Sequence, residues 1–427
     1  MGKFIAFGKN NKLYKYIWIY VILRLLNDYI FSEFFPKQMR LDIFYSNNYP
    51  PNILINNFFI YLGSFIFSIF IYFYEKSQVQ GAKRENSSQI HSETLKKYQL
   101  IHYIYQPDIK LSTIFVTAFL SIISIELTNI LIIFGFMSLF YFSFDLFFVA
   151  YINLIIFEIP IYSHKKCSII FIFIFSTIFK FLSSYEYISK DNYNLFYKNH
   201  IILIPIGIIS YILLSLLRFY ALCKIKWILD YKFVPVTVVF LIYNFVGVII
   251  LLISSLIPSY IKCIDKTKIN DIDLICFIKI DNEYYFDSFS YYFHQLWRND
   301  RNVGMNILYL FLFLIQLFLN ALRLLYSVLI VKHLNPEYYL CSFGIYFFIV
   351  RLICLIDAII NKGDIKTNIY DLFVDVGSLI GVMIYLELIE LKVYNLNQNL
   401  KKNIEMRSIT ESGYFNLLDN ESENFEN

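Results

Sequence analysis

Long apolar stretches recur along the whole chain, and short polar segments separate them. A bilayer core about 30 Å thick needs roughly 20 mainly apolar residues per helix. The pattern therefore predicts ten transmembrane helices rather than a single anchor. The first five are expected near Leu13–Phe31, Ile53–Tyr74, Leu111–Phe134, Phe136–Ile159 and Ser168–Ser184. The second five are expected near His200–Cys223, Phe233–Ile261, Gly304–Val331, Tyr338–Ile360 and Asn368–Leu391.

The predicted spans divide into two halves of five. Residues 1–185 form the first half, with a polar loop over 75–110, and residues 186–391 form the second, with a polar loop over 262–303. An odd number of spans per half turns the second half upside down relative to the first. The sequence thus predicts an all-α polytopic membrane protein built as two inverted five-helix repeats. A polar tail, 392–427, follows, and its acidic, Asn-rich end is expected to be disordered.

Composition supports a membrane location. The chain is 58% hydrophobic and 16% charged, whereas a soluble domain carries about a quarter charged residues. The lipid bilayer is therefore an expected partner. Nucleic acid is not expected, because the chain has no long run of basic residues. Cys263 and Cys276 share a predicted loop and could form a disulfide there, although unpaired thiols are favoured. No Cys or His spacing indicates a metal site, and no cofactor is expected.

Basic residues indicate the orientation. Lys and Arg concentrate in the N-terminal segment, in the even-numbered loops and in the tail, which predicts that both termini are cytosolic. The loop over 262–303 is then lumenal or extracellular. The N-glycosylation sequons at Asn86 and Asn420 should be unused, because both fall on the cytosolic side. An endomembrane such as the Golgi or endoplasmic reticulum and the plasma membrane both fit, and a homodimer is left open.

Two arginines stand well inside predicted spans. Arg323 lies one turn after Asn320 in the eighth span, and Arg351 lies midway along the ninth. A charge at mid-bilayer costs about 3 kcal/mol on insertion scales, so each arginine needs a partner or a watery cavity. Two arginines on neighbouring helices could present bidentate donors to an anionic substrate. The alternative is pairing between helices, with Asp145, Glu126 or Asp375 as the partner.

We expect different roles for the other charged residues within the predicted spans. Glu126, with Asn129 nearby, and Asp145 have no cationic neighbour in their own spans, so they could face a cavity or form an inter-helix salt bridge. Arg24 and Asp28 are four residues apart and are expected to neutralise each other. For two basic residues near span ends, snorkelling to the interface is favoured over a functional role: Lys180 and Arg218. Packing is favoured for two acids on one face of the last span, Asp371 and Asp375.

Signatures of the common enzyme classes are missing from the chain. It contains no G-x-S-x-G, H-E-x-x-H, G-x-G-x-x-G or P-loop sequence. The sequence therefore predicts a protein that is not an enzyme, and a membrane-bound transferase has the least support. The leading hypothesis is a secondary transporter for a small molecule, and the second is a non-transporting membrane scaffold or receptor.

Four junctions between spans resemble the drug/metabolite transporter superfamily, in particular its nucleotide-sugar-transporter-like solute carriers. Ile161–Lys166 is similar to a Tyr-x-His-Gln/Lys segment between spans four and five of such carriers. Lys226–Pro235 resembles the linker after span six, and Leu334-Asn335-Pro336 stands where a Leu-Ser/Thr-Pro occurs. Tyr385–Leu391 resembles the Glu-Ile-Ile-x-Leu ending of that branch.

The resemblance covers roughly Phe136–Arg407 and keeps the order and spacing of these motifs. It implies a ten-helix carrier with a central cavity built from spans one to four and six to nine, cycling by alternating access. The leading hypothesis is then a carrier for a polar metabolite, with an anion such as a nucleotide sugar as one candidate, and Arg323 and Arg351 as the cations that face it. The substrate-binding residues we expect from the intramembrane charges are Arg323, Arg351, Asn320, Glu126 and Asp145.

Overall fold

A computed structural model describes the helical core of the protein. It covers residues 5–7, 14–27, 53–85, 110–133, 141–158, 161–179, 203–260, 278–280, 283–285, 288–297, 302–360 and 365–391. Several sequence predictions fall outside the described residues or side chains: those on Asp28, Asn86, Asn129, Lys180, Cys263, Cys276, Asn420 and the tail 392–427.

A helix lies at each of the ten predicted segments. In the first half these are α1 (Lys15–Arg24), α3 (Ile53–Glu85), α5 (Leu111–Ile133), α6 (Tyr141–Phe157) and α7 (Ser163–Phe173), which continues into the π-helix η3 (Ile174–Phe179). In the second half they are α10 (Leu203–Tyr231), α11 (Val236–Tyr260), α13 (Val303–His333), α14 (Pro336–Ile360) and α15 (Ile365–Tyr385).

Six helices within the described residues are long and apolar enough to cross a bilayer: α3, α5, α11, α13, α14 and α15. The outer surface of the bundle carries large apolar side chains, such as Phe70 (69% exposed), Ile155 (63%) and Phe311 (58%). So much exposed apolar surface requires a covering of lipid. The protein is an all-α, multi-pass membrane protein.

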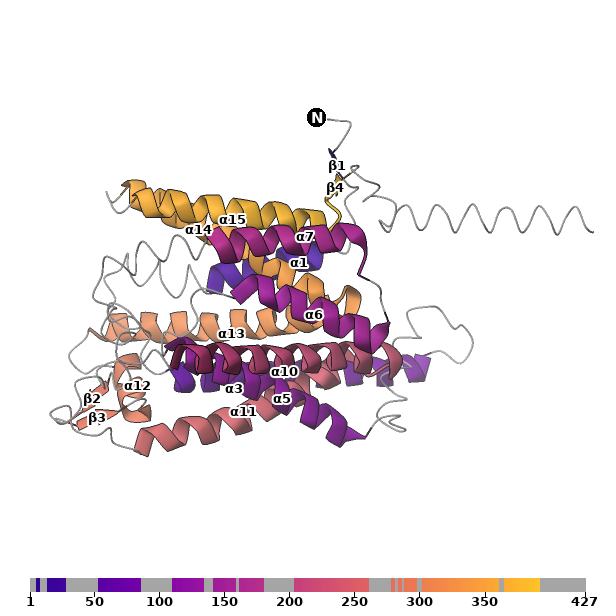
Figure 1. Cartoon of the computed structure of the whole chain (residues 1–427). Helices are drawn as coiled ribbons and strands as arrows, with labels where there is room; N and C mark the ends of the chain where they lie inside the picture. Colours follow the sequence, from indigo (N-terminus) through magenta and orange to yellow (C-terminus); the bar gives the residue numbers. More distant parts are fainter. Residues whose placement is uncertain are drawn as a thin grey trace, which may run out of the picture.

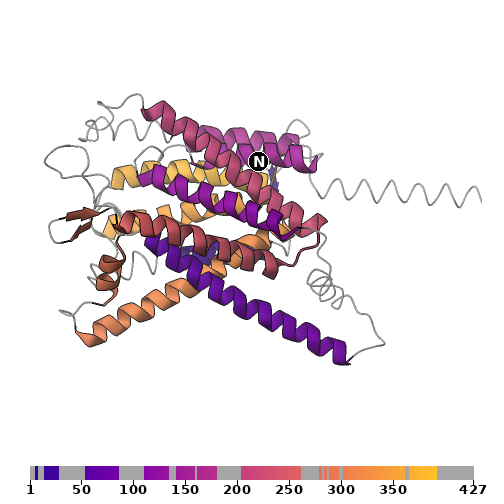
Figure 2. The same cartoon turned by 90° about the horizontal axis from the view of Figure 1, so that it is seen from below.

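The helices lie side by side in one bundle (Figures 1 and 2). Short elements mark its two ends in Figure 1. At one end, β1 (Ile5–Phe7) pairs antiparallel with β4 (Ile389–Leu391). At the other lie the ribbon of β2 (Ile278–Ile280) and β3 (Glu283–Tyr285) and the short helix α12 (Phe289–Leu296). Because β1 contacts β4, the chain crosses the bundle an even number of times between them.

These short strands leave the all-α class unchanged, although the sequence did not predict them. Each is three residues long, and hydropathy over a span-length window cannot detect so short an element.

The helices pack around two large apolar cores, and a smaller one joins α3, α12 and α13. One large core joins residues of α3, α5, α10, α11 and α13, and the other joins residues of α1, α6, α7, α10, α14 and α15. Leu222 on α10 and Tyr339 on α14 pack against both cores. The space between the two cores is where the bundle leaves room for a cavity.

Gly247 lets α11 approach α3 closely. A Cβ atom at this position would lie 2.2 Å from Cδ1 of Tyr61, which no real contact allows. The absence of a side chain at residue 247 therefore makes room for the Tyr61 ring, and Tyr61 is only 6% exposed.

Helix α10 extends beyond its predicted end at Cys223 and stops at Tyr231. The predicted apolar segment ends where charged residues begin. The helix continues because these charged residues find partners within the protein. Lys226 forms an i,i+4 ion pair with Asp230 at 2.8 Å and donates to the Lys332 carbonyl at 2.6 Å. This extension places Arg218 in the interior of the helix rather than near its end.

Candidate functional site

A cavity of about 260 Å³ lies inside the bundle. Residues from α1, α3, α5, α10, α11, α13 and α14 line it, so both halves of the chain contribute. These seven helices are among the eight spans that the resemblance implies as the walls of a central cavity. Helix α6, the predicted fourth span, supplies none of the described lining residues.

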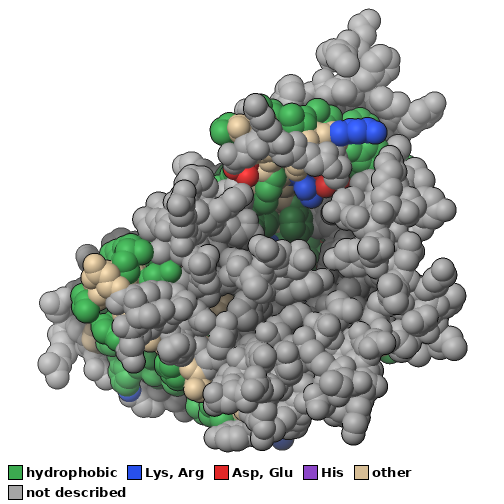
Figure 3. All heavy atoms as spheres, turned by 90° about the vertical axis from the view of Figure 1, so that its left-hand side faces the viewer, with side chains coloured by type: hydrophobic (Ala, Val, Ile, Leu, Met, Phe, Trp, Pro, Cys, Tyr) green, Lys and Arg blue, Asp and Glu red, His purple; other side chains and the backbone are tan. Residues whose placement is uncertain are grey.

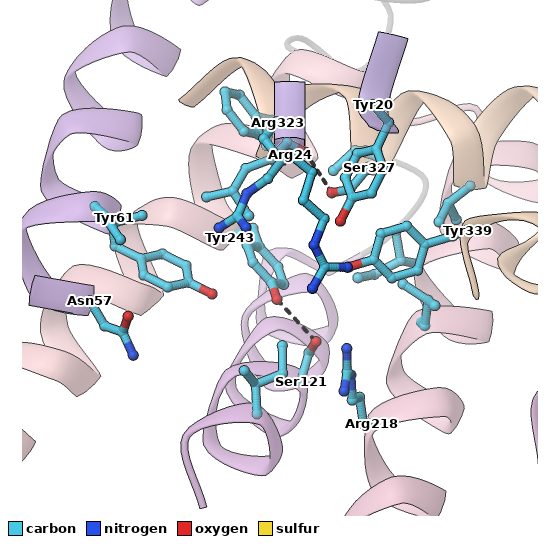
Figure 4. A pocket seen from close by; sticks show the side chains of 18 of the residues that line it. Tyr20, Arg24, Asn57, Tyr61, Ser121, Arg218, Tyr243, Arg323, Ser327 and Tyr339 are labelled. Atoms are coloured by element: carbon cyan, nitrogen blue, oxygen red, sulfur yellow. Dashed lines mark hydrogen bonds between the residues drawn. The ribbon is translucent and has the colours of Figure 1, made fainter. Parts of the chain in front are cut away.

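Three arginines from three helices reach this cavity. Arg24 lies on α1, Arg218 on α10 and Arg323 on α13. Their guanidinium groups point into the same space (Figure 4). The Arg24 guanidinium is 4.0 Å from the centre of the Phe343 ring and 4.4 Å from that of Tyr346, both on α14. These cation–π contacts fix Arg24 beside the cavity and connect α1 with α14.

Tyrosines form much of the remaining wall. Tyr20 and Tyr339 meet edge to face, with their ring centroids 5.5 Å apart. The Tyr243 hydroxyl lies 3.1 Å from the Ser121 hydroxyl, and Figure 4 marks this hydrogen bond. Tyr61 lies opposite Tyr339 in the same view. A tyrosine wall offers hydroxyl groups for hydrogen bonding on an otherwise apolar surface.

Glu126 supplies the cavity's carboxylate. It lies on α5, is 5% exposed, and accepts a hydrogen bond from the Asn57 side-chain amide of α3 at 3.0 Å. The described lining carries three guanidinium groups and one carboxylate, and the Asp145 carboxylate of α6 interacts electrostatically with Arg218 from outside the lining. Guanidinium groups outnumber these two carboxylates, which favours an anion in a low-dielectric interior.

Arg323 and Glu126 are the predicted binding residues that line the cavity. The side chains of Asn320, Asp145 and Arg351 make contacts between helices outside the lining, and Asp145 also interacts electrostatically with Arg218 of the cavity. Asn320 donates to the Asn27 side chain at 2.8 Å and to the Gln316 carbonyl at 3.0 Å. The Asp145 carboxylate accepts from the Tyr211 hydroxyl at 2.8 Å, which connects α6 with α10.

Arg351 pairs with two carboxylates of α15. Its Nη1 lies 2.9 Å from Asp371, and its Nε lies 3.5 Å from Asp375. Pairing with Asp375 is one of the alternatives that the sequence leaves open for this arginine. The two arginines of the predicted hairpin are thus in different surroundings, with Arg323 at the cavity and Arg351 between α14 and α15.

Sequence reasoning missed Arg24 and Arg218 as cavity residues. The expectation that Arg218 snorkels to the interface rested on a helix end near Cys223, and the true end at Tyr231 removes that reason. The expected pairing of Arg24 with Asp28 lies outside the described residues, and the Arg24 guanidinium also lies over the aromatic rings of α14, beside the cavity. A helix boundary at Tyr231 would have placed Arg218 near the middle of α10, where snorkelling to the interface is less favoured.

A second polar cluster lies near the end of the bundle that carries β1 and β4. Lys165 on α7 pairs with Glu337 on α14 at 2.7 Å, and the Asn153 amide on α6 donates to the same carboxylate at 2.9 Å. His164 lies 3.4 Å from Glu387 just beyond α15. Residues of two of the resembling junctions, Ile161–Lys166 and Tyr385–Leu391, therefore meet here, and their contacts join the two halves of the chain.

The opposite end has a different surface. Figure 3 views the molecule from the side on which α12 lies. On the described part of this face, hydrophobic side chains border a hollow, and Lys or Arg and Asp or Glu side chains gather at its edge.

Comparison with known proteins adds no assignment. No protein-family model matches the chain, and no curated protein matches it at a significant level. Among the described residues, no three His, Cys, Asp or Glu side chains lie together as a metal site would require. The chemistry of the arginine-lined cavity is therefore the basis for assigning a function.

Proposed function

We propose that the protein is a secondary transporter that carries a polar, anionic metabolite across its membrane by alternating access. The observation that carries this proposal is the convergence of Arg24, Arg218 and Arg323 in one cavity inside the bundle. Ionisable residues at membrane depth are costly and usually mark a substrate pathway. Arginine is also suited to this task, because its planar fork binds carboxylate and phosphate groups through paired hydrogen bonds.

The pattern of helix contacts supports an inverted-repeat transporter. In the proposed repeat, the helices of the first half correspond in order to those of the second: α1 to α10, α3 to α11, α5 to α13, α6 to α14 and α7 to α15. If each helix is replaced by its counterpart, the contact of α1 with α13 becomes that of α10 with α5, and both contacts are present. The contact of α3 with α13 becomes that of α11 with α5, and the contact of α1 with α14 becomes that of α10 with α6. Three counterpart pairs also contact each other: α3 with α11, α6 with α14, and α7 with α15. Such exchange is expected around a pseudo-two-fold axis in the membrane plane.

The location of the cavity fits alternating access. In inverted-repeat carriers, substrate sites lie near the bilayer midplane between the repeats, and one repeat rocks against the other. Here residues of both halves enclose the cavity. Both termini are proposed to be cytosolic, from the excess of basic residues on that side. The β1–β4 pairing places residues 5–7 and 389–391 at the same end of the bundle, which fits an even number of spans between them.

Uptake into proteoliposomes tests the transport proposal. Purified protein should accumulate a labelled organic anion, and Arg218→Ala and Arg323→Ala should each reduce the rate at least tenfold, because each removes a cation from the cavity. Lys366→Ala, at an exposed position of α15, is the matched control and should transport at the normal rate. Undiminished uptake by the well-folded Arg218→Ala, Arg323→Ala double variant contradicts the proposal.

A non-transporting scaffold or receptor is the second candidate. The observation in its favour is that several intramembrane charges, such as Lys165 with Glu337, pair between helices and serve packing. A scaffold would give no substrate-dependent uptake, and its arginines could be replaced without effect on partner binding. The same proteoliposome assay therefore separates the two functions.

A further inference from the structure

The short helix α12, in the loop over 262–303, is fixed against the bundle. The Tyr292 ring of α12 stacks on the Phe59 ring of α3, with the ring centroids 5.2 Å apart. Tyr292 and Leu296 also join Ile55 of α3 and Phe313 of α13 in the smaller apolar core. Tyr292 and Leu296 are four residues apart, so they lie on one face of the helix. This face attaches α12 to α3 and α13.

A second apolar stripe lies beside the attached face. It consists of Phe293 and of Trp297, the residue after α12, and each follows one of the two buried residues by a single position, about 100° around the helix. Their side chains are 53% and 47% exposed. Phe293 meets the Phe59 ring edge to face, with the ring centroids 5.8 Å apart, so the stripe borders the attached face. Two neighbouring aromatic side chains thus remain half exposed, and water solvates such a surface poorly.

The attached face fixes the depth of α12. The apolar span of α3 begins at Leu54, and the contact residues Ile55 and Phe59 lie one and five residues after it. At 1.5 Å per residue, these contacts fall within about 8 Å of the end of the span. Helix α13 has 31 residues, about 46 Å, and exceeds a hydrocarbon core of about 30 Å, so its contact at Phe313 is compatible with this level. Interfacial helices bury their apolar face to a similar depth, about 5–10 Å, at the boundary between headgroups and acyl chains.

The direction of α12 matches this depth. In Figures 1 and 2 the helix runs across the direction of the long helices, so it lies along the plane of the bilayer. The chain then enters α13, whose first turns carry exposed apolar side chains such as Val303 and Ile307, on a surface that lipid covers. Tryptophan is enriched at membrane interfaces, because its ring is apolar and its N–H is polar.

We propose that α12 is an interfacial helix whose Phe293 and Trp297 side chains insert into the headgroup region of the bilayer, in the leaflet at the α12 end of the bundle. The partner is a lipid surface rather than a second copy of the chain, because the depth and direction of α12 are those of a bilayer surface. Part of the loop that the sequence predicts to be polar is thus held on the membrane. This inference goes beyond the proposed function and does not depend on transport.

Tryptophan fluorescence in liposomes of brominated phosphatidylcholine tests this contact, because bromine quenches tryptophan only at short range. The chain has three tryptophans, and the variant Trp18→Phe, Trp227→Phe keeps Trp297 alone. Lipids brominated near the glycerol backbone should quench Trp297 at least about twofold more strongly than lipids brominated at the chain ends. Acrylamide in the aqueous phase should quench it at least about threefold less than it quenches free tryptophan in buffer.

Control variants make the test specific. Phe293→Asp should release the stripe from the membrane, so that lipid quenching of Trp297 falls and acrylamide quenching rises, each by at least about twofold. Phe293→Leu stays apolar and should leave both unchanged. Phe318→Trp, in a chain whose three tryptophans are replaced by Phe, reports a deeper position, because Phe318 is 53% exposed and meets Phe67 near the middle of the α3 span. Bromine at the chain ends should quench this variant more strongly than bromine near the glycerol.

Two outcomes overturn the inference. Strong quenching of Trp297 by acrylamide without quenching by lipid places α12 in water. Weak quenching by both reagents places protein on the stripe, such as a second copy of the chain. If the variant with Trp297 alone does not fold, the difference between the wild-type protein and Trp297→Phe gives the same comparison with one substitution.

Discussion

Replacing Arg351 by alanine should lower the stability of the fold rather than remove a substrate-binding residue. The guanidinium lies 2.9 Å from Asp371 and 3.5 Å from Asp375, and its side chain is 28% exposed. The two carboxylates are 17% and 16% exposed. Alanine leaves both carboxylates on one face of α15 without this cation, and they then repel each other.

The contacts set the size of the effect. At an effective dielectric constant of about 20, each contact is worth roughly 5 kcal/mol before desolvation is subtracted. Removal of one partner of a buried pair costs about 3–5 kcal/mol, and the partial exposure of Arg351 places it at about 3 kcal/mol. At roughly 2 °C for each kcal/mol in a chain of this size, the melting temperature should fall by roughly 6 °C.

Thermal melting of detergent-solubilised protein, followed by size-exclusion chromatography, measures this change. Neutralising both acids in the same variant, with Asp371→Asn and Asp375→Asn, should recover most of the loss, because no unpaired charge remains. If Arg351→Ala melts at the wild-type temperature and yet abolishes anion binding, the structural role is wrong and a substrate role for this arginine is restored.

Three further predictions concern packing and topology. Gly247→Ala should lower the stability by about 1–3 kcal/mol in thermal melts, because the new methyl group collides with Tyr61, whereas Gly304→Ala, with no neighbour closer than 3.9 Å, should be tolerated. Lys165→Met should reduce expression strongly because it leaves the buried Glu337 carboxylate without its cation, and adding Glu337→Met should restore expression. A sequon engineered into the loop that carries β2 and β3 should receive a glycan in cells, and its absence there would contradict cytosolic termini.

The sequence alone determined the class of the protein and the positions of its helices. Burial in lipid requires a local property, a run of apolar residues long enough to cross the bilayer, and each run can be read without knowledge of the others. For this reason α5 begins at the predicted Leu111, and α14 ends at the predicted Ile360. Helix ends with charged residues, such as that of α10, were predicted less well, because inter-helix contacts decide whether a lysine can be accommodated there.

Only the tertiary structure decided which intramembrane charges share a cavity. Arg323 and Arg351 look alike in sequence, each an arginine inside an apolar helix, yet one lines the cavity and the other pairs with α15. Arg24 and Arg218 join Arg323 from helices that are distant in sequence. The physical reason is that the direction of a side chain depends on the rotation of its helix against its neighbours, and long-range packing fixes that rotation.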